Sequence, residues 1–511
     1  MNIQLVWYKR DLRLHDHPAL SAAARRGPVL PLYIVEPSLI TAPDFASRHW
    51  TFISGCLREL RDALSALGQP LVVRVGEAVE ALDRLASEWP IAAIWAHEET
   101  GNLLSYARDR AVRRWARARG IPFYELPQNG VVRRLPSRDE WEARWEERMS
   151  AAQAIPPQSL PLLPIDPGPI PAAADLDLPP DMLLDRQPPG ETAALTTLTD
   201  FLNRRSQRYH RALSSPLTAW EGCSRLSAYL AWGALSLRTV VQATRNRIAE
   251  LRHDPDLAAA GWLRALTTFE SRLHWHCHFI QKLEDEPELE VRNLVRAYDG
   301  MRETNERPDL IAAWAAGRTG YPFVDACMRA LNATGWLNFR MRAMLVSFVC
   351  YDLWQHWREP GLILARRWID YEPGIHYSQL QMQAGTSGNR AIRIYNPVKQ
   401  GIDHDPEGVF IRRWLPELAH VPNPFIHTPW LLDRTGQERA GCRIGRDYPF
   451  PIVDHEAAYR RARAAIAAVR ARPETAREVA AVFEKHGSRR PPLQRPRRSQ
   501  SVSDRQLRLD L

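Results

Sequence analysis

Several features that define common classes of protein are missing from this sequence of 511 residues. No run of about 18 apolar residues occurs, so we expect no membrane-spanning helix. The first twenty residues become charged before a signal-peptide apolar region could form, so no secretory signal is expected. The six cysteines are scattered without a CxxC pair, which disfavours a disulfide framework or a closed zinc site and makes a cytoplasmic location the default.

Lysine is also scarce, because only four of the 68 basic residues are lysines. The 59 acidic residues leave a net charge of +9, which favours an anionic partner without naming one. Residues 486–511 hold seven arginines against two aspartates and little apolar content. We predict that this segment is a disordered basic tail.

Short apolar runs alternate with amphipathic stretches over residues 1–130. The runs that indicate buried strands are 3–7, 29–35, 71–73 and 93–95. Helical spacing of apolar residues follows at 48–67 and 103–119. This alternation predicts an α/β domain with a doubly wound parallel sheet. No GxGxxG follows the first run, so the usual dinucleotide fingerprint is absent.

The pattern changes at residues 131–190, which we interpret as an interdomain linker. Eleven prolines lie between Pro156 and Pro189, and such a stretch cannot supply a regular hydrogen-bond ladder. From residue 191 to about 475 the spacing is mostly helical with short Gly/Pro breaks. The sequence therefore predicts a second, larger, all-α domain.

Several motifs point to one family. Residues 7–20, WYKRDLRLHDHPAL, closely resemble the opening of the photolyase/cryptochrome family. Further matches follow in family order at residues 223–227, 317–336, 393–400, 426–430 and 451–455. The resemblance implies an α/β antenna domain joined to an all-α domain that binds FAD. It also implies light-driven electron transfer from reduced flavin to damaged DNA.

The resemblance also assigns residues to the cofactor. They are Tyr209, Cys223, Ser224, Arg225, Leu226, Ser227, Arg342, Asp370, Glu372 and His376. Hydroxyls and free N–H groups at Ser224 and Ser227 suit a diphosphate, although a plain helix cap is the alternative for either serine. Arg342 and Asp370 would form a fork at the flavin ring, and a structural ion pair is the alternative.

His376 replaces the asparagine that faces the flavin's reactive ring nitrogen in the family's photolyases. An imidazole there could donate a proton to the flavin or tune its radical state. A satisfied buried histidine is the alternative. The family's relay of three tryptophans is broken, because Leu380 and Thr304 stand at two of its positions and only Trp357 remains for electron transfer.

The part of the chain expected to face DNA departs from the family as well. Phe339 occupies the position at which family members that repair cyclobutane dimers usually carry an asparagine. Met382 occupies the position of a tryptophan that stacks on the lesion in the family. Glu270 is our candidate for the acid that bonds the lesion, whereas a gapless alignment places Phe269 there. The resemblance assigns DNA contacts to Arg340, Arg393 and Gln400.

We expect no metal, because His274 and His278 share a helical face without a third ligand of obvious spacing. A second, antenna chromophore is possible near residues 97–101, and nothing in the sequence identifies it.

These observations lead to one hypothesis and one alternative. The hypothesis is a monomeric lyase that splits cyclobutane pyrimidine dimers in UV-damaged DNA, with Glu270, His376 and Arg340 as catalytic residues. The pocket changes at Phe339 and Met382 favour the alternative, a blue-light receptor of the cryptochrome kind that repairs nothing. Retention of Arg340 and Gln400 argues against that alternative.

Overall fold

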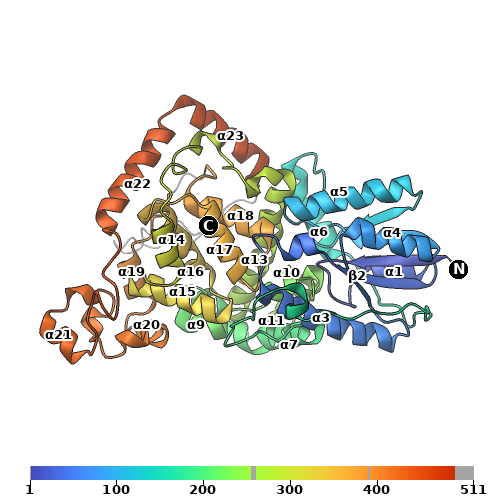
Figure 1. The fold of residues 1–511 in the computed structure, drawn as a ribbon, viewed down its shortest axis with the longest axis horizontal. Helices are drawn as coiled ribbons and strands as arrows, with labels where there is room; N and C mark the ends of the chain where they lie inside the picture. The colour runs from blue at the N-terminus through green and yellow to red at the C-terminus, as the bar shows by residue number, and fades with distance from the viewer. Residues whose placement is uncertain (1, 255–260, 389–391, 490–511) are drawn as a thin grey trace.

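A computed structural model describes residues 2–254, 261–388 and 392–489. Figure 1 shows an α/β domain that contains the N-terminus beside a larger domain built of helices. The fold class predicted from the sequence is confirmed. Within the described residues, no helix is long and apolar enough to cross a membrane.

The α/β domain is built on five parallel strands in the order β3-β2-β1-β4-β5. They are β1 (Ile3–Tyr8), β2 (Val29–Val35), β3 (Val72–Val75), β4 (Ile91–His97) and β5 (Phe123–Leu126). Leu5 at the centre pairs with Leu30 on one side and Ile94 on the other. The fifth strand was not predicted, because it is a short edge strand whose residues stay partly exposed.

Helices cover both faces of this sheet. They are α1 (Pro18–Ala24), α2 (Pro37–Ile40), α3 (Ser47–Ala66), α4 (Ala78–Glu88) and α5 (Leu103–Ala118). Leu5 and Trp7 pack with α4 and α5 in one core. Val6 and Tyr8 point to the other face, whose core continues into the helical domain. The two domains are therefore joined by a shared apolar core.

The segment interpreted as a linker is only partly extended. It contains one helix, α6 (Trp141–Ser150), whose Trp141, Trp145 and Met149 are buried. Beyond α6 the chain runs with a single 3-10 turn, Ala173–Leu176. The Pro167 carbonyl accepts a hydrogen bond from the Val73 N–H, so the proline-rich chain follows the edge strand β3. The linker boundaries at 131 and 190 remain predictions.

The helical domain begins at α7 and surrounds a central helix, α13. Its helices up to α13 are α7 (Glu191–Asp200), α8 (Tyr209–Ala212), α9 (Pro216–Gly222), α10 (Ser227–Ala231), α11 (Leu237–Arg252) and α13 (Trp262–Asp285). After α13 come α14 (Pro308–Ala315), α15 (Pro322–Thr334), α16 (Phe339–Ser347), α17 (Arg358–Arg367), α18 (Pro373–Ala384), α19 (Pro397–His404), α20 (Val409–Trp414) and α21 (Arg434–Arg439). α13 packs against α18, which places the residues after Asp370 in the centre of the domain.

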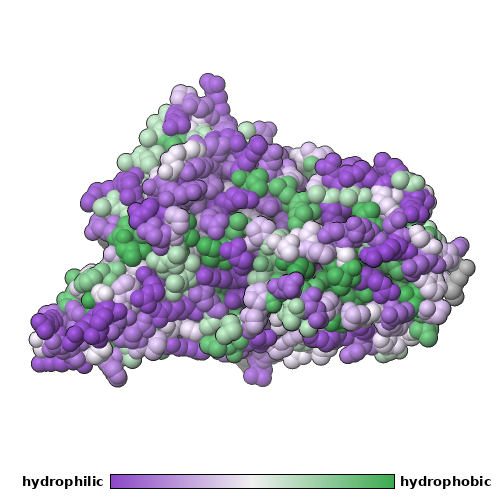
Figure 2. All heavy atoms as spheres, in the orientation of Figure 1, coloured by the Kyte–Doolittle hydropathy of each residue, from purple (hydrophilic) through white to green (hydrophobic). Residues whose placement is uncertain are grey.

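Two long helices form an arch at the C-terminal end of the described chain (Figure 1). They are α22 (His455–Arg470) and α23 (Pro473–His486), so helical structure continues past the predicted boundary at 475. The arch is mostly hydrophilic on the face drawn in Figure 2. Of the predicted basic tail, 486–511, residue 486 ends α23, and residues 490–511 lie outside the described residues.

Candidate functional site

The best-defined polar contact among the predicted cofactor residues is the fork between Arg342 and Asp370. Arg342 on α16 donates from Nη1 to Oδ1 at 3.0 Å and from Nη2 to Oδ2 at 2.7 Å. The Asp370 side chain is 2% exposed. Burial opposes its charge, yet Arg342 and the Ser227 hydroxyl hold the pKa of Asp370 below its usual range. The predicted fork is therefore present.

Residues 223–227 form a turn with free donors directly before α10. Arg205 donates to the carbonyl oxygens of Cys223 and Ser224, at 2.5 and 3.3 Å. Within the described part of the chain, the backbone N–H groups of Ser224, Arg225 and Ser227 have no hydrogen-bond acceptor. Unpaired N–H groups in a turn of this kind suit an anionic group.

Arg225 adds a cation to this turn. Its guanidinium lies between two indole rings, 3.8 Å from the centroid of Trp220 and 4.1 Å from that of Trp336. Nη1 is buried without a partner among the described residues. Burial lowers the pKa of Arg225 to about 10. A clamped arginine with an open donor, beside free N–H groups, fits the diphosphate of FAD. The sequence missed both tryptophans, although the 317–336 motif ends at one of them.

Tyr209 closes another side of the site with aromatic contacts. Its ring is 5.7 Å from Phe201 and 5.6 Å from Phe269, both edge to face. Burial raises the pKa of Tyr209, so the phenol is neutral. Phe269 is 3% exposed and packs with Phe201 and Tyr209 in the apolar core. Of the two alignments considered, the structure places Phe269, not Glu270, beside Tyr209.

Glu270 is not brought to the site. Its carboxylate accepts a hydrogen bond from Arg245 of α11 at 2.7 Å, and Arg245 also bonds Glu146 of α6. One residue turns a helix by about 100°, so Glu270 points away from the face that Phe269 presents. The expectation that Glu270 meets the lesion is not supported by this position.

Glu372 also lies away from the fork. Its carboxylate pairs with Arg10 of the α/β domain at 3.5 Å, and burial raises the pKa of Glu372. Arg10 further donates to the carbonyl of Tyr371 at 2.5 Å and stacks on Trp232. Glu372 thus joins the two domains in this structure.

The His376 side chain on α18 is held by a hydrogen bond to the backbone of α17. Its Nε2 lies 2.9 Å from the Gly361 carbonyl, which can only accept, so Nε2 carries the proton. Burial lowers the pKa of His376 to about 4, which leaves the ring neutral near pH 7. Nδ1 is then an acceptor. The predicted role as proton donor is not favoured by this tautomer.

Residues expected to meet DNA lie at the first turn of α16, on α19 and, for Arg393, in the segment before α19. Phe339 is 43% exposed and Arg340 beside it is partly buried. Asn338 is buried and donates to the Leu213 carbonyl at 3.0 Å, so it cannot reach a ligand from the surface. Gln400 is 6% exposed and its Oε1 has no partner among the described residues. Arg393 is partly exposed.

The predicted electron carrier, Trp357, is fully buried and donates from Nε1 to Asn293 Oδ1 at 2.8 Å. Leu380 is buried and Thr304 is exposed, so the two other relay positions carry no aromatic ring.

One cluster of possible metal ligands occurs within the described residues, at Asp11, His17 and His97. Asp11 Oδ2 lies 3.0 Å from His17 Nε2 and 2.6 Å from His97 Nδ1. The Leu20 N–H donates to His17 Nδ1, which leaves the proton on Nε2. A protonated nitrogen cannot bind a metal, so the cluster is a hydrogen-bonded structural group.

A cavity of about 100 Å³ lies between the domains, beside the carboxyl ends of β1 and β2. Its lining includes Asp44, Glu99, Arg108, Trp232 and Tyr371. Arg108, one of the lining residues, forms ion pairs with Glu36, Glu99 and Asp109.

Comparisons with known proteins agree with this geometry. Residues 4–135 match the DNA photolyase family, and residues 269–468 match the FAD binding domain of DNA photolyase. A cryptochrome DASH of Gloeobacter violaceus is 32% identical over 88% of this chain and 93% of its own length. A deoxyribodipyrimidine photo-lyase of Escherichia coli is 32% identical over 90% of this chain and 97% of its own. A crystal structure of a bacterial class III photolyase from Agrobacterium tumefaciens superposes with a TM-score of 0.81 and 30% identity, covering 92% of this chain and 98% of that chain.

Proposed function

The chain belongs to the photolyase/cryptochrome family and carries its FAD-binding domain, and from that premise we propose that it repairs cyclobutane pyrimidine dimers in DNA under light. The reaction is a light-driven lyase reaction that splits the cyclobutane carbon–carbon bonds. Several relatives about 30% identical are named deoxyribodipyrimidine photo-lyase, which supports this activity for the present chain.

One observation carries the proposal. Helix α16 presents the exposed Phe339 and the partly exposed Arg340 at its first turn, and Arg342 of the next turn forks Asp370 inside the protein. Phe339 and Arg342 are three residues apart, so they share a face of the helix. A short helix therefore connects an aromatic and cationic surface with the residues that would hold the flavin ring. This arrangement suits a substrate that must come close to the cofactor.

Each group then has a distinct task. FAD, when bound, supplies the electron that opens the cyclobutane ring in light. A dimer must leave the DNA stack to reach a buried cofactor, and Phe339 offers a ring on which it can stack. Arg340 would contact phosphate, which gives affinity without sequence readout. Arg342 and Asp370 fix the ring site, and Arg225 with the 223–227 turn neutralises the diphosphate.

A specific observation favours a second candidate, a flavin photoreceptor without repair activity. Phe269, and not the acidic Glu270, packs beside Tyr209, and a relative of comparable identity is a cryptochrome DASH. An aromatic ring cannot donate a hydrogen bond to a lesion's pyrimidine edge, whereas a protonated carboxyl can.

The two candidates are separated by one experiment. Chemically reduced holoprotein is mixed with an oligonucleotide that contains one thymine dimer, and the recovery of thymine absorbance is followed under blue light. Repair predicts recovery in light and none in the dark. Absence of recovery at saturating protein, together with binding no tighter than to the undamaged oligonucleotide, supports the receptor instead.

The interdomain cavity is the candidate place for a second chromophore. Ligand pockets usually enclose about 300–1,000 Å³, and the cavity of about 100 Å³ is smaller than that. The absorption spectrum of the supernatant after denaturation tests whether any second chromophore is carried.

A further inference from the structure

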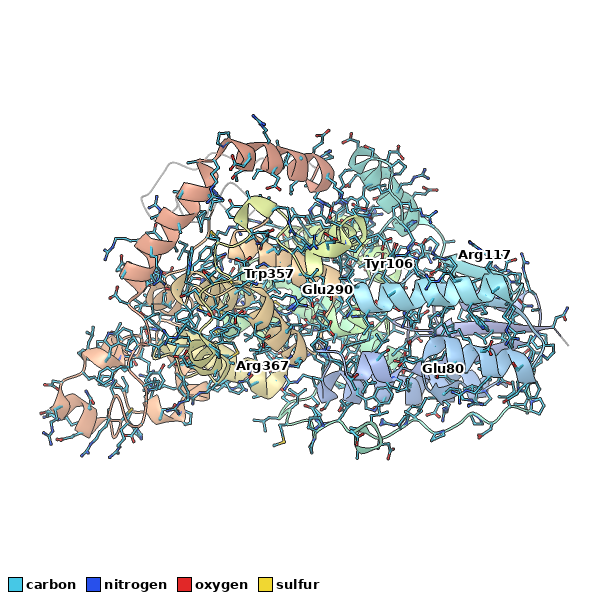
Figure 3. The ribbon with its side chains drawn as sticks, turned by 45° about the horizontal axis from the view of Figure 1, so that its top comes forward. Glu80, Tyr106, Arg117, Glu290, Trp357 and Arg367 are labelled. Carbon is cyan, nitrogen blue, oxygen red and sulfur yellow. The ribbon has the colours of Figure 1, made fainter. Side chains whose placement is uncertain are left out.

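An aromatic contact connects the surviving relay residue with the flavin site by a route that the sequence did not predict. The ring centroid of Tyr377 is 6.4 Å from that of Trp357 and 5.2 Å from that of His376. Trp357 and Tyr377 are 0% and 1% exposed. Figure 3 shows Trp357 within the helical domain. Tyr377 and Leu380 are three residues apart on α18, so the tyrosine ring occupies the face on which the relay position is aliphatic.

The Tyr377 hydroxyl has a path for its proton. It lies 3.4 Å from the Tyr371 hydroxyl, which in turn donates to Asp44 Oδ2 at 2.6 Å. Because Tyr371 has a single proton and gives it to Asp44, Tyr377 must donate to Tyr371. Burial raises the pKa of both phenols, so both are neutral at rest. Tyr371 and Asp44 line the interdomain cavity, through which a proton can exchange with water.

We propose that Tyr377 carries the electron between Trp357 and the flavin, and that its proton moves through Tyr371 to Asp44. The proposal rests on the flavin site described above. It concerns light-driven reduction of the oxidised cofactor, which prepares the protein for its proposed function.

The electrons and protons balance. Tyr377 would give one electron to the flavin, when it is bound in its oxidised form and excited by light; the Tyr377 proton would then pass to the Tyr371 oxygen, and the Tyr371 proton to Asp44. Trp357 then gives one electron to the tyrosyl radical, and the two protons return along the same path. The Trp357 N–H is bonded to the amide oxygen of Asn293, a poor base, so Trp357 becomes a radical cation that keeps its proton. A soluble thiol finally restores Trp357.

The decisive variants change one oxidisable group at a time. Tyr377→Phe keeps the ring but removes the redox-active hydroxyl, and we expect photoreduction of air-oxidised holoprotein with thiol to slow by about tenfold. Trp357→Phe leaves the radical on Tyr377 without a donor to refill it. The radical signal in the electron paramagnetic resonance spectrum of the illuminated, frozen Trp357→Phe protein should then become narrower when its tyrosines are ring-deuterated.

Tyr371→Phe tests the proton path separately, because Tyr377 and its ring contacts remain. We expect photoreduction of this variant to slow by a similar factor, although phenylalanine fills the same space. The matched control is Tyr351→Phe, which removes a buried hydroxyl that has no partner among the described residues and should leave the rate unchanged. The FAD content of every variant is measured from its absorbance, so that loss of cofactor is not mistaken for loss of electron transfer.

Wild-type photoreduction rates in both Tyr377→Phe and Tyr371→Phe would overturn the proposal. A trapped radical in Trp357→Phe that ignores tyrosine deuteration would overturn it as well. The repair assay with chemically reduced wild-type protein needs no photoreduction. Failure of that assay alone therefore sinks the proposed repair function and leaves the tyrosine route standing.

Discussion

Asp370 is the buried partner and Arg342 the partly exposed one in the fork at the centre of the site. The Asp370 side chain is 2% exposed and that of Arg342 is 25% exposed. The carboxylate accepts both guanidinium bonds and also meets the Ser227 hydroxyl. A fixed carboxylate of this kind orients the guanidinium and links α16 to the 223–227 turn.

Loss of Arg342 should therefore lower both the stability of the protein and its FAD content. Arg342→Ala leaves Asp370 buried without its main cation, and breaking a buried pair in this way typically costs about 3–5 kcal/mol. We expect a lower urea midpoint and a purified protein with little FAD. Arg342→Lys keeps the charge but loses the planar fork, so its urea midpoint and FAD content should lie between those of the wild type and of Arg342→Ala. Equal FAD content in all three proteins would contradict a role for the fork at the cofactor.

The sequence predicted this fork because the family resemblance assigns both residues to the flavin ring. It also predicted four strands of the sheet, since buried parallel strands are continuous apolar runs. The sequence did not predict α6, because the prolines around it indicated an extended chain. The buried face of this helix includes two tryptophans. The periodicity of such a short helix was outweighed by the composition of its surroundings.

Other positions depend on side-chain orientation that the sequence does not define. Glu270 and Phe269 are neighbours in sequence, and only helix phase decides which one faces Tyr209. Glu372 turned toward Arg10 because the α/β domain packs against the start of α18. Neither position follows from residue spacing, since each depends on how two distant elements meet.

Asp325 explains part of the 317–336 motif in structural terms. Its carboxylate accepts bonds from the Thr319 N–H at 2.7 Å, the Gly320 N–H at 3.0 Å and the Tyr448 hydroxyl at 2.6 Å. Asp325→Ala leaves several buried donors unpaired and should lower the free energy of unfolding by about 3 kcal/mol. Tyr448→Phe removes one bond and should cost about 1 kcal/mol. Urea denaturation gives both values, and the opposite ranking would reject this role.

Glu290 should make stability depend on pH. It accepts a hydrogen bond from the Leu103 N–H at the start of α5 at 2.6 Å, and burial raises the pKa of Glu290 to about 7. Figure 3 shows Glu290 near the start of α5, where it meets the Leu103 N–H. The folded state binds the proton more tightly than the unfolded state, so the contribution of Glu290 falls as pH rises from about 5 to about 8.

Glu290→Gln keeps an acceptor for the Leu103 N–H without a buried charge. We expect the variant to exceed the wild type by about 2 kcal/mol near pH 8 and to match it near pH 5. Urea midpoints at both pH values measure this difference. A constant difference between variant and wild type across the range would show that Glu290 does not titrate as described.

Phe339 and Arg340 should contribute to DNA binding in different ways. Arg340→Ala removes a phosphate contact, so affinity should fall equally for damaged and undamaged oligonucleotides, and the slope of log K against log salt should decrease by about one. Phe339→Ala removes a stacking ring, which typically costs about 1–3 kcal/mol, and only dimer-containing DNA should be affected. The control is Arg117→Ala on α5, an exposed arginine of the α/β domain that should change neither affinity. Fluorescence anisotropy at several salt concentrations measures all three variants. If Phe339→Ala weakens both oligonucleotides alike, the first turn of α16 binds backbone and the lesion is recognised elsewhere.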